Sequence, residues 1–144
     1  MKEFILDASV GVKWLFKAEE GADRAALFIE KFERKEIKIY VPEFFYIELA
    51  NACWVKVRKR LADIDSVVEG LDRILALSLT PYPDTELADV ALENSLRFNI
   101  SAYDGLYLAL AEIYVAPLVT ADERLLEICR GRFDFIESLH GVSL

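Results

Sequence analysis

An α/β fold with a mostly parallel central sheet is predicted by two features of this sequence. Short apolar runs that suit buried strands alternate along the chain with longer segments of helical periodicity. In addition, 54% of the 144 residues are hydrophobic and aromatic residues occur throughout, which supplies one sizeable core and argues against disorder. No linker, repeat or low-complexity tract divides the chain, so we expect a single domain over residues 1–144.

The first part of the chain predicts two strands with helices between them. EFILD (3–7) is a short apolar run that ends in an acid, which suits a buried strand, and ASVGVKWLF (8–16) follows as a turn into a short helix. Residues 19–36 place their apolar side chains at helical spacing. IKIYVP (37–42) predicts the second strand, which ends at Pro42.

The middle of the chain predicts two helices and a strand. Residues 43–60 have helical periodicity, and Pro42 suits the first turn of that helix. Residues 63–77 predict another helix with an acid-rich start. The run LSLTPYP (77–83) could supply a third strand.

The last third predicts further helices and two more strands. In order these are helices over 84–99 and 99–116, a strand, a turn and a helix over 117–131, and a closing strand over 133–139. Asp84 or Thr85 suits the N-cap of the first of these helices, and Gly131 is expected at the C-cap of the last.

The sequence predicts a soluble, cytoplasmic protein that does not enter a membrane. The apolar run at the start, in MKEFILD, is too short for a secretory signal. The most apolar window, LYLALAEIYVAPLV, is interrupted by Glu112 and Pro117 and falls short of the roughly 20 residues of a membrane span. Cys53 and Cys129 are too few for a disulfide framework and are interpreted as small buried hydrophobic residues.

Two acids follow predicted strands directly. Asp7 comes after Phe4-Ile5-Leu6, and Asp122 comes after Leu118-Val119-Thr120. Ligands of parallel sheets bind beyond the carboxyl ends of the strands, which is where both acids should lie. Glu48 shares a core-facing stripe of its helix, although glutamate is rarely buried unpaired, and Asp104 stands at the head of the apolar helix over 99–116.

Each of these acids also has an ordinary structural explanation. Asp104 and Asp122 could be helix N-caps. Asp7 could be a turn residue, and Glu48 could reach water or a lysine at the edge of its helix. Convergence of all four would be costly without a cation, and Mg²⁺ or Mn²⁺ would resolve it because these ions favour carboxylate and water oxygens.

Three polar side chains could orient the acids or a water molecule in such a site. Ser9 and Thr120 are close in sequence to two of the acids, and Asn51 lies one helical turn after Glu48. For the two hydroxyl residues, ordinary turn chemistry is the alternative.

The charge balance bears on the class of protein. A formal net charge of −8 argues against a general nucleic-acid binder, which carries a basic face, but not against an enzyme that gathers acids around a metal. Lys13 could contact a phosphate near the metal. The basic run KVRKR (56–60) is better explained as a complement to a helix dipole on a solvated face.

Four segments together resemble a known family over essentially the whole chain. LDASVGVKWL, VPEFFYIELANA, SAYDGLYLALA and LVTADERLL come in the order and spacing of the PIN-domain ribonucleases, and within them of the VapC-type toxins of toxin–antitoxin pairs. The resemblance implies a three-layer α/β/α fold and a Mg²⁺- or Mn²⁺-dependent endoribonuclease, in which metal-activated water attacks a phosphodiester of RNA. It also implies a cognate antitoxin and a homodimer.

The resemblance assigns the site residue by residue. It places the catalytic, metal-binding acids at Asp7, Glu48, Asp104 and Asp122, of which Asp7 and Asp104 match the most regular ligands. The alternatives are a PIN-type nuclease that acts in RNA processing or on DNA without an antitoxin, and an inactive binding module with the same fold. A small-phosphoester phosphatase is disfavoured because Asp7-Ala8-Ser9 lacks the second acid of a DxD pair. The single histidine, His140, is expected at the surface.

Overall fold

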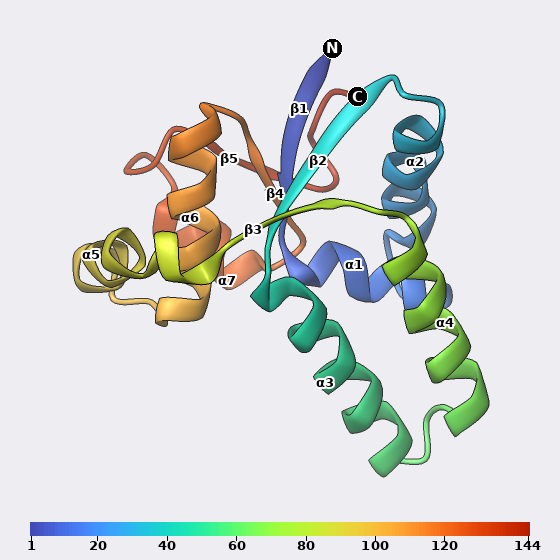
Figure 1. Ribbon diagram of the computed structural model, residues 1–144. Helices are drawn as coiled ribbons and strands as arrows, with labels where there is room; N and C mark the ends of the chain where they lie inside the picture. Colours follow the sequence, from blue (N-terminus) through green and yellow to red (C-terminus); the bar gives the residue numbers. More distant parts are fainter.

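The computed structural model describes residues 1–144 and contains one five-stranded sheet (Figure 1). The strands lie in the order β3-β2-β1-β4-β5, and every neighbouring pair is parallel. Their bounds are Lys2–Leu6 for β1, Ile37–Pro42 for β2, Thr80–Tyr82 for β3, Leu118–Thr120 for β4 and Ile136–Ser138 for β5. The predicted α/β class is confirmed, and the sheet is parallel throughout.

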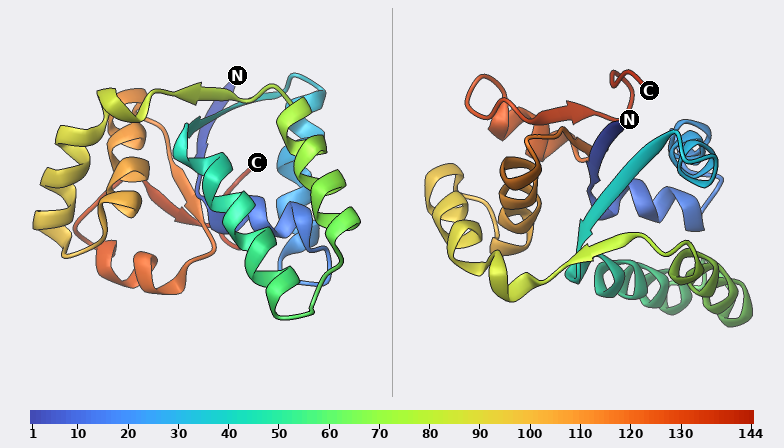
Figure 2. Two further views of the ribbon diagram at one scale, coloured as in Figure 1. Left: turned by 60° about the horizontal axis from the view of Figure 1, so that its bottom comes forward. Right: turned by 45° about the horizontal axis from the view of Figure 1, so that its top comes forward.

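Seven α-helices cover the two faces of this sheet. Helices α5, α6 and α7 lie on one face and α1 to α4 on the other, which gives three layers (Figures 1 and 2). Their bounds are Ala8–Leu15 for α1, Ala22–Glu33 for α2, Phe44–Arg58 for α3, Ile64–Ala76 for α4, Ala88–Phe98 for α5, Ala102–Tyr114 for α6 and Glu123–Cys129 for α7. The helices that follow β1 and β4 cover opposite faces, so the strand order reverses between these two neighbours.

The core is centred where β1 meets α6. Phe4, Ile5 and Leu6 are each at most 2% exposed, as expected for a central strand covered on both faces. Helix α6 is buried at every position from Gly105 to Ala111, which matches its almost continuous apolar sequence. None of the helices combines the length and hydropathy that crossing a bilayer requires.

Most predicted segments are present with shorter bounds. The predicted helix over 19–36 begins only at Ala22, because Gly21 adopts a left-handed conformation with φ of 82°. The predicted strand over 37–42 is confirmed as β2, in which Pro42 is the last residue and pairs with Tyr82. Pro42 therefore does not enter the first turn of α3, which the sequence also allowed, because α3 begins at Phe44. Gly131 was predicted at the C-cap of α7, but that position belongs to Arg130. Gly131, with φ of 72°, is the next residue.

The sequence-based prediction for single side chains was correct at three places. Both cysteines, Cys53 and Cys129, are buried and unpaired. His140 is exposed.

The start of the predicted helix over 84–99 differs in an informative way. A short 3₁₀ turn, η1 (Asp84–Glu86), precedes α5, and the N-cap of α5 is Leu87 without a side-chain hydrogen bond. Asp84 instead contacts the start of α3. Its Oδ1 accepts a hydrogen bond from the backbone N of Phe44 at 3.2 Å, and its backbone N donates to Glu43 Oε1 at 3.1 Å. The N-cap assignment to α5 was therefore wrong, because pairing of β3 with β2 brings Asp84 to the head of a different helix.

Helices α5 and α6 pack closely at Gly105. A Cβ atom added at this glycine would lie 2.4 Å from the backbone O of Ala91 in α5, a distance that side chains do not tolerate. Because the contact is with backbone, no rotamer change can relieve it. Gly105 directly follows Asp104, so this contact also fixes the position of the first turn of α6.

Replacing Gly105 by alanine is expected to lower the free energy of unfolding by about 1–3 kcal/mol, the usual cost of overpacking. Chemical denaturation measures the change. Gly141→Ala is the matched control, since an added Cβ there meets no atom within 4 Å. Equal unfolding midpoints for the two variants would show that α5 and α6 can move apart at Gly105 without loss of stability.

Candidate active site

The four predicted acids come from elements that meet at the carboxyl edge of the sheet. Asp7 follows β1 and is the N-cap residue of α1, and Asp122 follows β4 and is the N-cap residue of α7. The backbone N of Asp7 donates to the O of Val119 at 3.0 Å, which ties the end of β1 to the end of β4. These two acids therefore flank the place where the strand order reverses, the usual ligand position in such sheets.

Asp7 is held by two hydroxyl groups. Its side chain is buried, and its Oδ2 accepts hydrogen bonds from Ser9 Oγ and from Thr120 Oγ1, each at 2.7 Å. Burial raises the pKa of Asp7, and the two hydroxyls work against this by stabilising the charged form. Ser9 and Thr120 thus make the contacts with an acid that the sequence predicted for them.

The same hydroxyls also fix the turn that leads from β4 into α7. Ser9 Oγ accepts from the backbone N of Ala121 at 2.9 Å, and Thr120 Oγ1 accepts from the backbone N of Asp122 at 3.0 Å. Each hydroxyl therefore donates to one acid and accepts from the turn that carries another. Asp7 and Asp122 are thereby placed relative to each other by hydrogen bonds as well as by the sheet.

Glu48 faces the site from α3, where a tyrosine of α6 holds it. Tyr107 is fully buried, and its hydroxyl donates to Glu48 Oε1 at 2.6 Å. The pKa of Glu48 is raised to about 7, chiefly by burial. The hydrogen bond from Tyr107 lowers this pKa, and the charges of Asp7, Asp104 and Asp84 raise it. Glu48 forms no ion pair with a lysine, one of the alternatives considered for it; its partner is Tyr107, and it lies within electrostatic reach of Asp7 and Asp104.

Asp104 is not the N-cap of α6. That position belongs to Ser101, whose Oγ accepts a hydrogen bond from the backbone N of Asp104 at 3.2 Å. Burial raises the pKa of Asp104, and the charges of Asp7 and Asp122 raise it further, while Arg124 lowers it. The alternative of an ordinary cap was wrong for this residue, because Ser101 precedes it by three positions and satisfies the helix terminus.

Asp122 does cap a helix, so its ordinary explanation was correct. Its Oδ1 accepts hydrogen bonds from the backbone N atoms of Arg124 at 3.0 Å and Leu125 at 3.1 Å. Its charge nevertheless raises the pKa values of both Asp7 and Asp104. Capping and membership of the acidic cluster are therefore compatible in this residue.

The donor set suits a hard divalent cation. Carboxylate oxygens are the ligands that Mg²⁺ and Mn²⁺ prefer. Burial and then neighbouring negative charges raise the pKa values of Asp7, Glu48 and Asp104, and a bound cation would stabilise the charged forms of these acids. As the side chains lie, no three acidic, histidine or cysteine groups converge closely enough to share one ion. Asp7, Glu48 and Asp122 each direct an oxygen towards a protein donor instead.

Comparison with known proteins agrees with this arrangement of fold and acids. The family model described as the PIN domain matches residues 4–131, which span nearly the whole chain and all four acids. The chain belongs to the PIN-domain family. The sequence-based resemblance is confirmed at the level of the family.

Several relatives are VapC ribonucleases. The PIN domain is 33% identical to a VapC ribonuclease of Mycobacterium bovis and to ribonuclease VapC9 of Mycobacterium tuberculosis, in each case over 84% of this chain and 87% of the relative. It is 24% identical to ribonuclease VapC3 of Pyrobaculum aerophilum, over 87% of this chain and 93% of that protein. The relatives thus match the chain almost from end to end.

A solved structure shares the fold. The crystal structure of PAE2754 from Pyrobaculum aerophilum superposes with a TM-score of 0.64 and covers 96% of this chain and 92% of its own, at 22% sequence identity. At this identity the likeness concerns the fold alone. It supports the three-layer arrangement around a parallel sheet.

Three side chains near the acids were missed as site residues by the sequence analysis. Tyr107 lies one turn after Asp104, a spacing that signals a shared helix face. Arg124 lies two residues after Asp122, and Asp84 reaches the site only through the pairing of β3. No local pattern marks Asp84, because its proximity to Glu48 depends on two segments that are distant in sequence.

Two residues that the sequence predicted near the metal, Asn51 and Lys13, form no hydrogen bond or ion pair with the four acids. Asn51 is exposed on α3. Lys13 is directed towards α2: its Nζ donates to the O of Glu20 at 2.5 Å and lies 3.8 Å from Glu19 Oε1, and its side chain is only 12% exposed. Their roles beside a water molecule or a phosphate stay predictions, and Lys13 would have to leave these partners to reach the acids.

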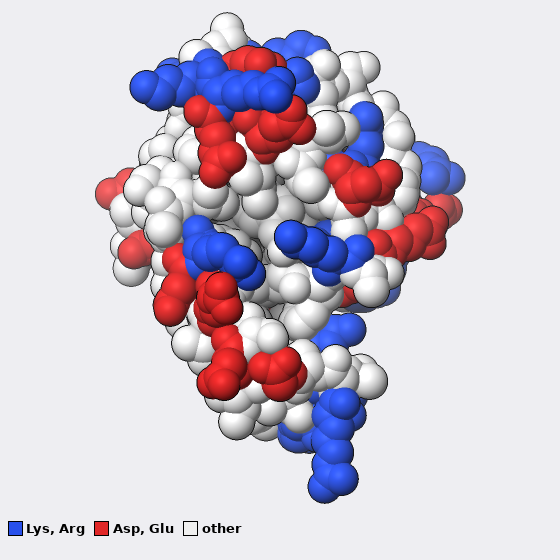
Figure 3. All heavy atoms as spheres, turned by 90° about the vertical axis from the view of Figure 1, so that its right-hand side faces the viewer, with Lys and Arg blue, Asp and Glu red and all other residues white.

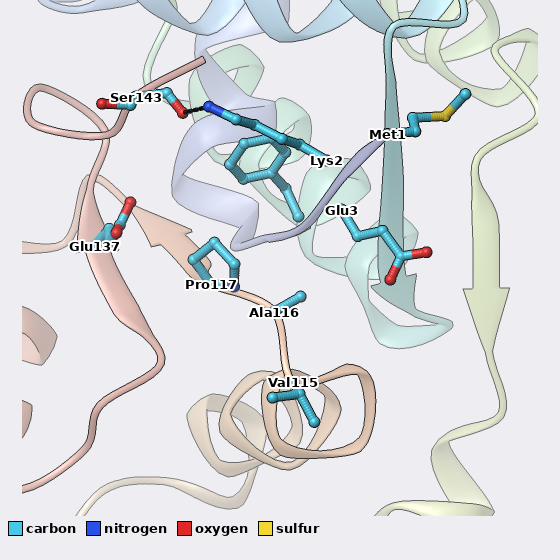
Figure 4. Close-up of a pocket in the computed structure, with 9 residues that line it drawn as sticks. Met1, Lys2, Glu3, Val115, Ala116, Pro117, Glu137 and Ser143 are labelled. Atoms are coloured by element: carbon cyan, nitrogen blue, oxygen red, sulfur yellow. Dashed lines mark hydrogen bonds between the residues drawn. The ribbon is translucent and has the colours of Figure 1, made fainter.

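A separate pocket lies at the opposite edge of the sheet (Figure 4). It is lined by the start of β1 and by the loop before β4. Within this lining, Lys2 Nζ donates a hydrogen bond to the backbone O of Ser143 at 3.4 Å. Most of its lining residues belong to the first part of β1 or precede β4, whereas Asp7 and Asp122 follow these two strands. The pocket therefore does not belong to the acidic edge of the PIN domain.

The metal-free protein is expected to gain stability as the pH falls from above 7 to 4.5. The folded-state pKa of Glu48 is about 7 against 4.5 for an ordinary glutamate, so its proton stabilises the fold fully below 4.5, and this contribution is lost as the pH rises through 7. The raised pKa values of Asp7 and Asp104 act in the same direction. Thermal unfolding in EDTA across this range measures the effect.

The matched variants for this measurement are Glu48→Gln and Glu137→Gln. The first should flatten the pH dependence, and the second, on an exposed residue of β5, should leave it unchanged. Identical pH profiles for Glu48→Gln and the unmodified protein would contradict the assignment of Glu48 as a destabilised carboxylate.

Tyr107→Phe is expected to lower the free energy of unfolding by about 1.5–3 kcal/mol above pH 7, since it removes a hydrogen bond to a charged group. The loss should be smaller at acidic pH, where Glu48 is neutral. Denaturant titrations at the two pH values measure it. Tyr114→Phe, at the far end of the same helix, is the control, and an equal loss at both pH values would argue against a charged partner.

Proposed function

We propose that this PIN domain is a Mg²⁺- or Mn²⁺-dependent endoribonuclease that hydrolyses phosphodiester bonds of RNA. The observation that carries the proposal is the set of four acids, Asp7, Glu48, Asp104 and Asp122, at one edge of the sheet, where burial and then neighbouring carboxylates raise the pKa values of Asp7, Glu48 and Asp104. Asp7 and Asp104 are the principal metal ligands, and Glu48 and Asp122 complete the site. Ribonuclease activity in the relatives' names supports the choice of RNA as substrate.

The residues of the chain have distinct roles in this proposal. Ser9 and Thr120 hold the carboxylate of Asp7 in one orientation and stabilise its charged form against the effect of burial. Tyr107 occupies Oε1 of Glu48, which leaves Oε2 for a further ligand. When bound, the metal supplies a lowered pKa for an attacking water and neutralises charge on the phosphate.

Arg124 is the cation best placed to assist with the substrate. Its charge lowers the pKa of Asp104, so it lies within electrostatic reach of the acids, and its side chain is exposed. A guanidinium group suits bidentate contact with phosphate oxygens. Arg124 therefore replaces Lys13 as the proposed phosphate contact.

We also propose that the protein is a cytoplasmic toxin of a toxin–antitoxin pair, forms a homodimer and is held inactive by a cognate antitoxin. Exposed apolar side chains on α3 and α4 support a protein partner: Ile47, Trp54, Ile64 and Val68 are each more than half exposed. A hollow between α1, α2 and α4, with Trp14 and Ile29 in its lining, offers a second apolar surface (Figure 3).

The main alternative is a PIN-type nuclease in RNA processing that has no antitoxin. A short open reading frame directly upstream, whose product co-purifies with this chain and blocks cleavage, would decide for the toxin. A full set of four acids argues against the other alternative, an inactive binding module.

The test of the enzyme is cleavage of a pool of structured and unstructured RNAs. We expect cleavage with Mg²⁺ or Mn²⁺, none with EDTA, and a loss of more than about 100-fold for Asp104→Asn, since even an outer partner of a metal ligand contributes about 10- to 100-fold. Asp89→Asn is the matched control, because Asp89 occupies the first turn of α5 and is exposed.

Absence of cleavage by the unmodified protein, together with absence of metal binding in calorimetry, would overturn the proposal. Circular dichroism of Asp104→Asn confirms that the variant is folded. Equal activity of the two Asp→Asn variants would likewise exclude a catalytic role for the acidic edge.

A further inference from the structure

Two aromatic rings are stacked beside the acidic edge. Phe44, at the start of α3, and Tyr103, in the first turn of α6, have ring centroids 4.6 Å apart and planes only 10° from parallel. Phe44 is partly buried, whereas Tyr103 is 58% exposed. Phe44 therefore supports one side of a tyrosine ring that is mostly open to solvent.

This pair is attached to the same helix starts as the acids. Tyr103 directly precedes Asp104, and Phe44 lies one turn before Glu48, or about 6 Å along the axis of α3. The backbone N of Phe44 is further fixed by Asp84 Oδ1 at 3.2 Å. The stack is thus held rigidly next to two proposed metal ligands.

The exposure of Tyr103 is not explained by the fold. A second stacked pair, Tyr40 and Tyr114, has centroids 3.8 Å apart, and both of its rings are partly buried against the core. Tyr103 instead leaves most of its surface in water, although burying an aromatic ring would be favourable. A ring that is rigid, backed by another and exposed next to a phosphodiester site is suited to a flat ligand.

We propose that Tyr103, supported by Phe44, is a stacking site for an unpaired base of the RNA, next to the phosphodiester that is cut. The inference rests on the proposed function and adds the form of its substrate. Bases of single-stranded RNA are recognised by stacking on aromatic side chains, whereas bases inside a duplex are not accessible. The enzyme would accordingly select unpaired segments.

The charge of the protein makes such a site necessary. At a net charge of −8, the chain gains little affinity from neutralising RNA phosphates, which is the term that falls with added salt. Stacking does not depend on net charge and is tolerant of sequence because every base has a flat face. Stacking on Tyr103 therefore provides affinity that the acidic surface does not.

The experiment measures binding of an unstructured oligoribonucleotide that carries one 2-aminopurine, moved along the strand in a series. The protein is the metal-free Asp104→Asn form, so that no cleavage occurs. Stacking on Tyr103 should quench the fluorescence of the probe at one position. Tyr103→Ala should remove this quenching and weaken binding about 10- to 100-fold, while Tyr103→Phe retains both.

Two controls separate stacking from other effects. Leu96→Ala removes an apolar side chain that is 78% exposed on α5 and should leave binding unchanged. The loss for Tyr103→Ala should be the same at low and high salt, and binding of duplex RNA should not respond to it. Tyr103→Ala in the otherwise unmodified enzyme should cut single-stranded RNA with a raised KM.

The outcomes distinguish the two proposals. Metal-dependent cleavage that needs Asp104, with unchanged binding and quenching in Tyr103→Ala, would overturn the stacking site and leave the nuclease intact. A change in the sedimentation of Tyr103→Ala with unchanged RNA binding would assign the ring to contact with a second copy, and would also overturn it. No RNA binding or cleavage by any form would overturn both proposals.

Discussion

The repulsion between carboxylates gathered at one edge of the sheet is the constraint on which the site depends. Asp7 is buried there, and burial and the charge of Asp122 both favour its neutral form. Two buried or half-buried hydroxyls, those of Ser9 and Thr120, oppose this by donating to one of its oxygens. These two donors, from α1 and β4, thus favour the charged form that a cation would require.

The frame around the acids is made from contacts between elements that are distant in sequence. The junction of β1 with β4 places two of the acids, and the hydroxyls of Ser9 and Thr120 bond to both sides of that junction. Helix α6 brings Asp104, and the close approach at Gly105 fixes its position against α5. Tyr107 connects the same helix to Glu48 on α3. These contacts set where the four acids stand on the backbone, while their side chains, as they lie, do not converge closely enough for three of them to share one ion.

In the proposed function, the acidity of the site limits how an RNA substrate would be bound. Cations close to the acids are few. Arg124 is within electrostatic reach of Asp104, whereas Lys13 donates to the backbone O of Glu20 and forms an ion pair with Glu19. The basic residues at the end of α3 lie far along a protruding hairpin (Figure 1). Metal, a guanidinium group and a stacked base together would supply the affinity that a basic groove supplies in other proteins.

The sequence by itself determined the α/β class and the alternation of elements, because short apolar runs alternate with segments of helical periodicity. It also predicted that Asp7 and Asp122 follow strands, since an acid directly after an apolar run marks a strand end in a parallel sheet. It could not determine the partners of those acids. Ser9 and Thr120 are 111 residues apart, yet their hydroxyl oxygens lie 3.2 Å from each other, and Asp84 caps α3 rather than the helix that follows it in sequence. Only the tertiary structure decided these contacts, since strand pairing and helix packing join residues that no local pattern connects.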